Sequence, residues 1–211
     1  MISHEIDHSE TPLRLFKSDF LEFFTHIHPA VVLIIWVPVV IYGLIRGIFD
    51  WPAANKTAGI IITFLIGLFI WTLAEYLLHR FLFHYHAKTP AMERVFFLFH
   101  GVHHAQPQCK TRLVMPPVVS IPLALLFYGL FQLFIGKLLG GGYLVGPLFS
   151  GFIGGYLFYD MTHYATHHFP MRTRVWKGLK RHHMRHHYKN PEMRFGVSSP
   201  LWDYIFDTMD E

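Results

Sequence analysis

The sequence predicts an all-α integral membrane protein, with four transmembrane helices and a histidine-rich helical cap on the cytoplasmic side. Three observations lead to this fold class. The 211 residues are 52% hydrophobic and only 15% charged, whereas a soluble globular domain carries roughly 25% charged residues. The hydrophobic residues gather in four long charge-free stretches. Thirteen of the 17 histidines lie in four clusters that flank these stretches.

The first 28 residues are expected to form an N-terminal segment that is amphipathic and interfacial. They mix charges with apolar residues, and they lack the basic start, short apolar core and small-residue cleavage site of a cleaved signal peptide. The favoured interpretation is an amphipathic helix over about 13–25 that lies on the membrane surface. Residues 29–211 are expected to form one membrane-embedded domain.

Four stretches are candidate spans, because a transmembrane helix needs about 20 apolar residues. They are Pro29–Ile45 with a continuation to about Phe49, Ala58–Ala74, Leu113–Gly136 and Leu138–Tyr159. Three consecutive glycines, Gly140 to Gly142, interrupt the last of them near its start. Isolated buried core helices could imitate one such stretch, but four in a chain of this length favour a membrane protein.

The distribution of basic residues predicts which side of the bilayer each segment faces. If all four stretches span, the N-terminus, residues 79–112 and the C-terminal tail share one side. That side carries 15 of the 18 Lys and Arg residues, all except Arg46, Lys56 and Lys137. An excess of Lys and Arg marks the cytoplasmic side. A hairpin architecture that enters and leaves from one leaflet gives the same sidedness. Both the endoplasmic reticulum and a bacterial inner membrane fit this orientation.

The histidine clusters have the spacing of residues that share a helix face. Positions three and four apart lie on one side of an α-helix, so three sets are expected to converge: His100, His103 and His104; His183, His186 and His187; His163 and His167. His79 and His84 are five apart and would diverge on a straight α-helix. We expect them to straddle the cytoplasmic end of the second span.

Ten imidazoles gathered on one side of a membrane point to metal binding. They would repel one another on protonation, and neutral imidazole suits iron, copper, zinc and nickel. Ten ligands suggest two metals, and the single cysteine, Cys109, excludes thiolate ligation. Two neighbouring metals at the edge of a bilayer suit activation of dioxygen by iron and attack on a lipid C–H bond. Glu75 and Asp160 each precede a histidine by about one turn, so each is a candidate to hold an imidazole N–H.

Several motifs resemble the fatty acid 2-hydroxylase family, a branch of the fatty acid hydroxylase/sterol desaturase superfamily. The resemblance covers about residues 12 to 208. The His-box spacing fits the whole superfamily, and two further stretches, Arg112–Pro117 and Phe195–Asp203, narrow it to this branch. The matching stretches are Glu75–His84, His100–His104, Arg112–Pro117, Tyr159–Tyr164 and Phe195–Asp203.

The resemblance implies a non-haem di-iron enzyme that uses dioxygen and two electrons to hydroxylate carbon 2 of a long acyl chain, free or in a ceramide-type sphingolipid. Zinc is expected to replace iron in some purified protein. His86, His168 and His182 fall outside the ligand pattern, and Glu75 and Asp160 are expected to orient ligands. The ligand positions carry over onto His79, His84, His100, His103, His104, His163, His167, His183, His186 and His187.

Two departures from the family pattern affect these expectations. Cys109 stands where the family commonly has Asp, which leaves no carboxylate role for that position. Many members also carry an N-terminal cytochrome b5 domain, for which 28 residues before the first stretch leave no room. We therefore expect electrons from a separate cytochrome b5 or another reductase, docked on the basic surface of residues 172–189. The expected partners are the lipid bilayer and an acyl lipid substrate, with no nucleic acid.

Two other functions stay open on the sequence. One is another oxygenase of the superfamily, acting on a sterol or carotenoid, and only the family motifs separate it from a 2-hydroxylase. The other is a non-enzymatic metal-handling membrane protein. Transporters place ionisable ligands within their spans, whereas these histidine clusters lie at one edge of the predicted spans, which disfavours transport.

Overall fold

The computed structural model describes residues 6–52 and 54–210, which form helices and loops without any strand. The chain divides into two compact units, within each of which the residues lie close to one another in space. Unit 1 combines the described parts of residues 1–29, 73–114 and 159–211, and unit 2 combines residues 30–72 and 115–158. All-helical architecture, as the sequence predicts, is therefore confirmed for the described part of the chain.

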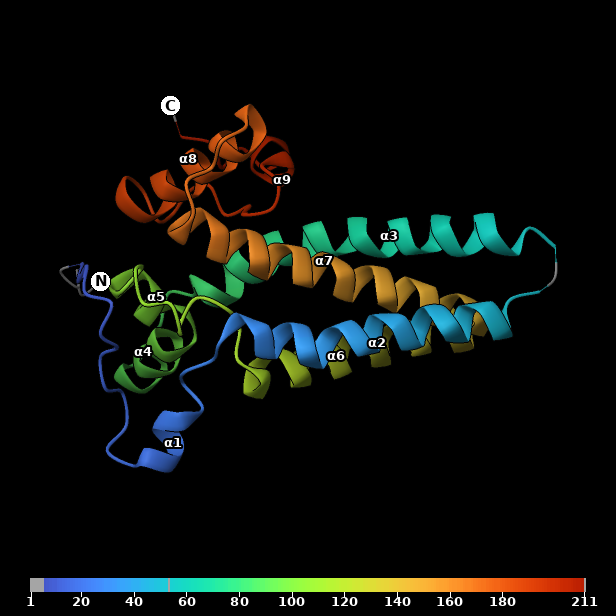
Figure 1. Cartoon of the computed structure of the whole chain (residues 1–211), viewed down its shortest axis with the longest axis horizontal. Coiled ribbons are helices and arrows are strands. Elements are labelled where there is room, and N and C mark those ends of the chain that lie inside the picture. Colours follow the sequence, from blue (N-terminus) through green and yellow to red (C-terminus); the bar gives the residue numbers. More distant parts are fainter. Residues whose placement is uncertain (1–5, 53, 211) are drawn as a thin grey trace. The chain divides into compact units, whose positions relative to one another are not determined.

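Unit 2 is built mainly from four long helices that run alongside one another (Figure 1). Pro117 opens one of them at a position where a missing N–H costs no hydrogen bond. The π-helical continuation of the same helix ends just before Gly140, whose φ of 67° lies in a region that favours glycine. The elements are α2 (Pro29–Asp50), α3 (Lys56–Leu77), α6 (Pro117–Phe131) with η3 (Gln132–Leu138), and α7 (Gly142–His168).

Glycines let α7 approach its neighbours at backbone distance. A Cβ added to Gly146 would lie 2.7 Å from the carbonyl oxygen of Gly43 in α2, and one added to Gly151 would lie 1.9 Å from that of Phe64 in α3. Close backbone approach through small residues is a common way to pack transmembrane helices. The buried ring of Phe152 fills the space between α3 and α6. Helix α7 thus contacts all three other helices of the unit.

Within the part of the chain that the structure describes, three helices are long and apolar enough to cross a membrane: Pro29–Asp50, Lys56–Phe83 and Pro117–Leu138. They carry large exposed apolar side chains such as Ile34, Phe49 and Leu125, which indicates a lipid-facing surface. The prediction of four spans is not confirmed, because α7 does not reach the same hydropathy. The physical reason is that α7 faces protein, so its sequence carries packing glycines and tyrosines in place of lipid-facing aliphatic residues.

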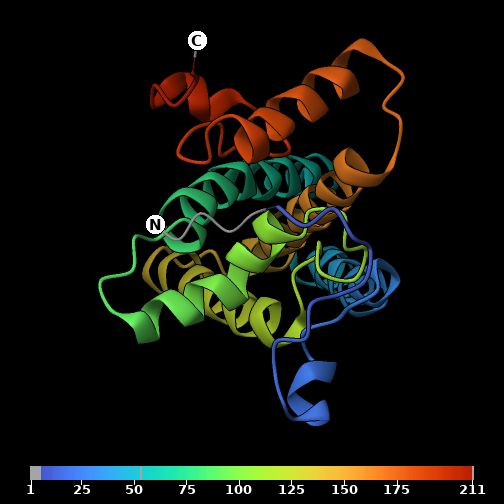
Figure 2. The same cartoon turned by 90° about the vertical axis from the view of Figure 1, so that its left-hand side faces the viewer.

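Unit 1 contains short helices together with the C-terminal ends of α3 and α7. Threonines cap two of them: Thr89 Oγ1 accepts the N–H of Met92, and Thr173 Oγ1 accepts that of Trp176. Helix α8 and the C-terminal segment with α9 lie beside each other in both views (Figures 1 and 2). The elements are α1 (Asp19–Phe23), η1 (Leu78–Phe83), α4 (Pro90–Phe96), η2 (Phe97–Gly101), α5 (Val102–Ala105), α8 (Arg174–Tyr188) and α9 (Leu201–Ile205).

The N-terminal segment is less helical than its sequence predicts. The helix expected over about 13–25 is only the five-residue α1, because the preceding N–H groups bond side chains instead of a helical ladder. The N–H groups of Leu15 and Phe16 donate to Glu22 Oε2 over 2.9 and 2.8 Å, and that of Leu13 donates to Gln106 Oε1 over 2.8 Å. Residues 6–18 therefore run as an irregular strap along the loop that follows α5.

Candidate metal centre

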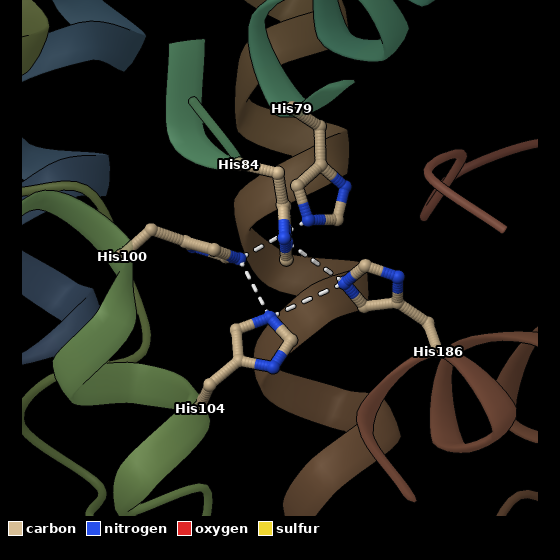
Figure 3. A group of neighbouring side chains, drawn as sticks. All are labelled: His79, His84, His100, His104 and His186. Atoms are coloured by element: carbon tan, nitrogen blue, oxygen red, sulfur yellow. Dashed lines mark hydrogen bonds between the residues drawn. The ribbon is translucent and has the colours of Figure 1, made fainter. Parts of the chain in front are cut away.

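Five histidines of unit 1 point toward one another and form a first group (Figure 3). The contacts between them join Nε2 atoms. His79 and His100 lie 3.1 Å apart, His100 and His104 3.0 Å, and His186 is 3.1 Å from His84 and 3.2 Å from His104. Residues from η1, η2, α5 and α8 thus meet at one point.

A π-helical turn brings His79 and His84 into the same group. The sequence predicts that they straddle the end of the second span, because residues five apart would lie on different sides of a straight α-helix. Helix α3 instead continues as η1, and the N–H of His84 bonds the carbonyl of His79 over 3.1 Å. The wider turn of a π-helix, with its i→i+5 bond, places residues five apart nearly above one another.

A second group gathers five more histidines from α5, α7 and α8. The Nε2 atom of His103 is 2.9 Å from that of His163 and 3.0 Å from that of His187. His183 Nε2 is 2.9 Å from His167 Nε2 and 3.1 Å from His187 Nε2. All five residues are buried. The group consists of His103, His163, His167, His183 and His187.

The two groups are neighbours, and they divide the sequence clusters differently from the helix-face expectation. His100 and His104 enter the first group, but His103 between them enters the second. On α8, His186 enters the first group and its neighbour His187 the second. The rings of His104 and His187 stack with centroids 4.2 Å apart. Adjacent residues on a helix diverge by 100°, so α5 and α8 each reach both groups.

Burial disfavours the protonated form of those histidines of the two groups that lie outside the candidate spans. In each case removal from water acts first and the surrounding imidazoles add to it. Burial also lowers the pKa of His186 to about 4, although the carbonyl of Met193 opposes this shift. Neutral imidazole is the form that binds metal. The pKa falls well below its ordinary value in His100, His103, His104, His183 and His187.

The size and chemistry of each group fit a bound metal ion. The five candidate ligand atoms of a group all lie within 4.8 Å of one another. Metal–nitrogen bonds of about 2.0–2.1 Å place opposite ligands about 4 Å apart, so a small adjustment brings five nitrogens to one ion. Both groups consist of histidine alone, and an all-imidazole set suits iron, copper, zinc and nickel.

The structure shows in detail the contacts of Glu75, one of the two expected orienting carboxylates. His79 donates its Nδ1–H to the carbonyl oxygen of Phe195. Glu75, one turn before His79, accepts the backbone N–H groups of Val197 and Ser198, each over 2.8 Å. Glu75 thus holds the segment that carries the acceptor of the His79 proton. Asp160 is buried in α7, and its contact with an imidazole stays a prediction.

The three histidines expected outside the ligand set lie outside both groups. His182 is engaged at both ring nitrogens, by Asp203 Oδ2 at 3.0 Å and by Arg194 Nη1 at 3.1 Å. His86 is exposed, 3.6 Å from Glu192. His168, next to His167, contacts Tyr164, with the two rings tilted by 47° and their centroids 4.7 Å apart.

A cavity of about 500 Å³ reaches members of both groups. His84, His100, His104 and His187 form part of its wall, and most of the remainder is apolar or aromatic. Its size falls in the range of small-molecule sites, about 300–1,000 Å³. Among the described residues that line it, the charged ones are Glu93 and Glu192, and no Lys or Arg takes part.

Sequence reasoning missed two polar residues that tie the strap to the loop after the second His box. Gln106 is buried, and its Nε2 donates to Asp7 Oδ2 over 2.6 Å. Arg112 belongs to a motif that the sequence singles out, but its role was not assigned. Its guanidinium donates to Glu22 Oε1 over 2.7 Å. A buried position for a long polar residue carries no signal in a single sequence.

Comparison with known proteins places these features in a family. The family model described as fatty acid hydroxylase matches residues 64–208. The hydroxylase domain visible in the solved structure of full-length scs7p superimposes with a TM-score of 0.82 at 36% identity, over 92% of this chain and 70% of that chain. The chain belongs to the fatty acid hydroxylase family, and the resemblance seen in its motifs is confirmed.

Individual relatives narrow the branch. The chain is 37% identical to a dihydroceramide fatty acyl 2-hydroxylase of Arabidopsis thaliana, over 93% of this chain and 79% of that protein. It is 41% identical to a ceramide very long chain fatty acid hydroxylase of Schizosaccharomyces pombe and 36% identical to a fatty acid 2-hydroxylase of Rattus norvegicus. These two alignments cover 90% and 94% of this chain, but only 53% and 57% of the two relatives.

Proposed function

We propose that the chain is a non-haem di-iron monooxygenase that hydroxylates carbon 2 of a long acyl chain in a ceramide-type lipid. The observation that carries this proposal is the pair of adjacent, buried all-histidine groups in a member of the fatty acid hydroxylase family. In the balanced reaction, one C–H bond becomes C–OH, dioxygen supplies that oxygen, and two electrons and two protons convert the other oxygen to water.

The ten histidines would hold two iron ions, five nitrogens to each. Bound iron supplies the one-electron steps that dioxygen chemistry requires. The protein keeps the imidazoles neutral by burial, and it orients His79 and His186 through backbone carbonyls. Asp160 is proposed to orient His163 from the preceding turn of α7, and zinc is expected at the same nitrogens in some preparations.

The cavity beside the two groups is the proposed substrate site. Its apolar wall suits an acyl chain, and its two glutamates disfavour a substrate carboxylate, because like charges repel and no described cation of the wall offsets them. An amide head group is uncharged and hydrogen-bonds to the same polar side chains. The lining therefore favours a ceramide-type lipid over a free fatty acid.

The distribution of Lys and Arg supports a cytoplasmic metal centre in an integral membrane protein. We propose that α7 is a fourth span that is shielded from lipid by α2, α3 and α6. The endoplasmic reticulum and a bacterial inner membrane both fit this orientation. The N-terminal segment is proposed to be interfacial, since α1 exposes Phe20 and Phe23 and precedes the first candidate span by five residues.

A separate electron carrier, cytochrome b5 or another reductase, is proposed to dock on α8. One face of this helix buries His183, His186 and His187, and its other face exposes Arg174, Lys177, Arg181 and Arg185. The helix contains no acidic residue. A cationic face suits an acidic carrier, because charge complementarity speeds association. The position of this face directly behind the histidines shortens the path for electrons.

Lipid analysis of cells that express the chain tests the proposed function. We expect ceramides with one added oxygen at carbon 2, located by tandem mass spectrometry. A double variant of His104 and His187 to Ala serves as the inactive control, since it removes one ligand of each group. An added oxygen on a sterol or carotenoid, with unmodified acyl chains, would replace the proposal by another oxygenase of the superfamily.

A further inference from the structure

The segment 193–198, between α8 and α9, contributes no histidine to either group, yet its backbone contacts two of the ten histidines. The carbonyl oxygen of Met193 accepts the Nδ1–H of His186 over 2.7 Å, and that of Phe195 accepts the Nδ1–H of His79. Both histidines belong to the first group. A carbonyl that takes the Nδ1 proton fixes the tautomer and the ring orientation, so Nε2 keeps its lone pair for a metal.

Two buried carboxylates hold the same segment from its other side. Asp203 accepts the N–H groups of residues 195–196, each over 2.8 Å. Glu75 accepts those of residues 197–198, also over 2.8 Å each. The side chains are almost completely buried, with Asp203 0% and Glu75 3% exposed. Four consecutive N–H groups thus end on two carboxylates, and charge-assisted bonds of this kind are roughly twice as strong as neutral ones.

The local sequence is adapted to this close approach. A Cβ on Gly196 would lie 2.1 Å from the carbonyl oxygen of Ser199 and 2.8 Å from Asp203 Oδ2, so only glycine fits. The Thr208 hydroxyl donates to Asp203 Oδ1 over 2.7 Å, and His182 Nε2 lies 3.0 Å from Asp203 Oδ2. All acceptor positions of this carboxylate are therefore directed by the surrounding chain.

Within the described residues of the second group, comparable support is confined to His163, which hydrogen-bonds the backbone of Leu113 and which Asp160 is proposed to orient. The Nδ1 atoms of four of its histidines are buried and have no hydrogen-bond partner there: His103, His167, His183 and His187. We infer that residues 193–198 form a clamp that preorganises the first metal position and not the second, with Asp203 and Glu75 as its positioning residues. This inference rests on the proposed metal centre and makes the two positions inequivalent.

Zinc binding to the full chain in detergent tests the inference without measuring hydroxylation. In a His103→Ala/His167→Ala background the first group is intact and the second keeps three imidazoles, fewer than the four ligands that zinc usually takes, so the tight Zn²⁺ reports the first position. In a His100→Ala/His104→Ala background it reports the second. We expect Asp203→Asn, whose amide NH₂ replaces one accepting oxygen and so loses the N–H bond of residue 195 or 196, to weaken Zn²⁺ binding roughly 10- to 100-fold in the first background. It should leave the affinity in the second background unchanged.

Matched variants separate positioning from general damage. Asp207→Asn removes the same charge at an exposed site four residues away and should leave both affinities unchanged. Glu75→Gln keeps an oxygen for the N–H groups of residues 197–198, so it should retain more of the first affinity than Glu75→Ala. If Asp203→Asn does not fold, Ser198→Ala, which removes only the hydroxyl bond to Glu75, should give a smaller loss confined to the first position.

The possible outcomes are distinct. An equal loss of Zn²⁺ affinity in both backgrounds would show that Asp203 supports the fold in general, and no loss in either would show that the clamp does not preorganise the site. Both results would overturn the inference while leaving the metal centre in place. Failure of the unmodified chain to bind two Zn²⁺ ions would instead contradict the proposed metal centre itself.

Discussion

Single histidines next to each other in the sequence take different parts in the proposed centre. His103 lies in the second group, with both its neighbours of the same cluster, His100 and His104, in the first. His167 lies in the second group, and His168 lies in neither. Because a rotation of 100° separates adjacent residues on a helix, a single-residue shift changes or abolishes the metal contact. This assignment can be tested position by position.

We expect His103→Ala and His186→Ala each to lower hydroxylation at least about 100-fold, because each removes a ligand from a different group. Each variant should also lose about one of two bound metal ions, measured by elemental analysis of purified protein. His168→Ala is the control and should keep most of its activity and both metals. All three should insert in the membrane equally well. Equal loss of activity in the three variants would show that the division between ligands and other histidines is wrong.

The ion pair between Glu22 and Arg112 predicts a pH dependence of stability. Burial raises the pKa of Glu22, but the N–H of Phe16, His26, the N–H of Leu15 and the charge of Arg112 outweigh it and lower the pKa to about 2, from 4.5. A lowered folded-state pKa stabilises the protein above the unfolded value. The contribution is therefore complete above about pH 4.5 and is lost as the pH falls toward 2.

Replacing Glu22 with Gln should reveal this contribution. We expect Glu22→Gln to lower the free energy of unfolding by roughly 2–4 kcal/mol at pH 7, since it leaves the buried Arg112 unpaired. The difference in free energy of unfolding between this variant and the unmodified protein should shrink as the pH falls below 4.5. Thermal unfolding in detergent at a series of pH values measures this difference. Asp19→Asn, at an exposed ion pair, should have little effect. A difference that stays constant down to pH 2 would contradict the assigned pKa.

The secondary-structure elements show which features the sequence can predict. Charge-free stretches predict the long helices, because this pattern is local. Spacings of four predict histidines that share a group, whereas spacings of three join residues that enter different groups, such as His100 and His103. The π turn of η1 rests on a local i→i+5 bond between His84 and His79 that no residue pattern marks. The clamp at residues 193–198 depends on hydrogen bonds between distant segments, so no local pattern indicates it either. Helix α1 is shorter than predicted for the same reason, since Glu22 and Gln106 bond the backbone that would otherwise continue it.

Close packing of α7 against α3 gives a prediction for these elements. A Cβ at Gly151 would clash with the carbonyl of Phe64, whereas a Cβ at Gly129 in α6 would meet no atom within 4 Å. Gly151→Ala should therefore destabilise the protein by about 1–3 kcal/mol through overpacking. Gly129→Ala should be neutral or slightly stabilising, as expected for Ala in a helix. Unfolding in detergent compares the two, and equal effects would show that α3 and α7 are not in backbone contact.

For the molecule as a whole, the proposed docking of an electron carrier on α8 gives a prediction. The double variant Arg174→Glu and Arg181→Glu reverses the exposed face of α8 without touching the buried histidines. We expect the rate of electron transfer from reduced cytochrome b5 to fall roughly tenfold or more at low salt, with a smaller loss at high salt. Lys88→Glu with Arg94→Glu makes the same charge change at exposed residues elsewhere and should have a smaller effect.

A small-molecule reductant separates docking from catalysis in the same proteins. If α8 is the docking face, the reversed variant should hydroxylate normally when a soluble chemical reductant replaces the carrier. Loss of activity with both reductants would indicate damage to the metal centre. Unchanged transfer from the carrier would place the docking face elsewhere, and loss of binding to anionic vesicles alone would assign the basic face to the membrane surface.

The position of the hydroxylated carbon follows from where the lipid head must stay. His79 and His84 lie at the end of a candidate span, which places the proposed metals near the membrane–water interface. The amide head stays where it finds hydrogen bonds, because burying it unpaired costs roughly 2–7 kcal/mol. The tail gains up to about 0.8 kcal/mol for each methylene removed from water, and less when it leaves a bilayer. Carbon 2 is the first carbon after the head with a C–H bond.

We therefore expect hydroxylation at carbon 2 for acyl chains of every accepted length, measured by tandem mass spectrometry across a length series. A hydroxyl that keeps a fixed distance from the methyl end would show that the site measures from the tail.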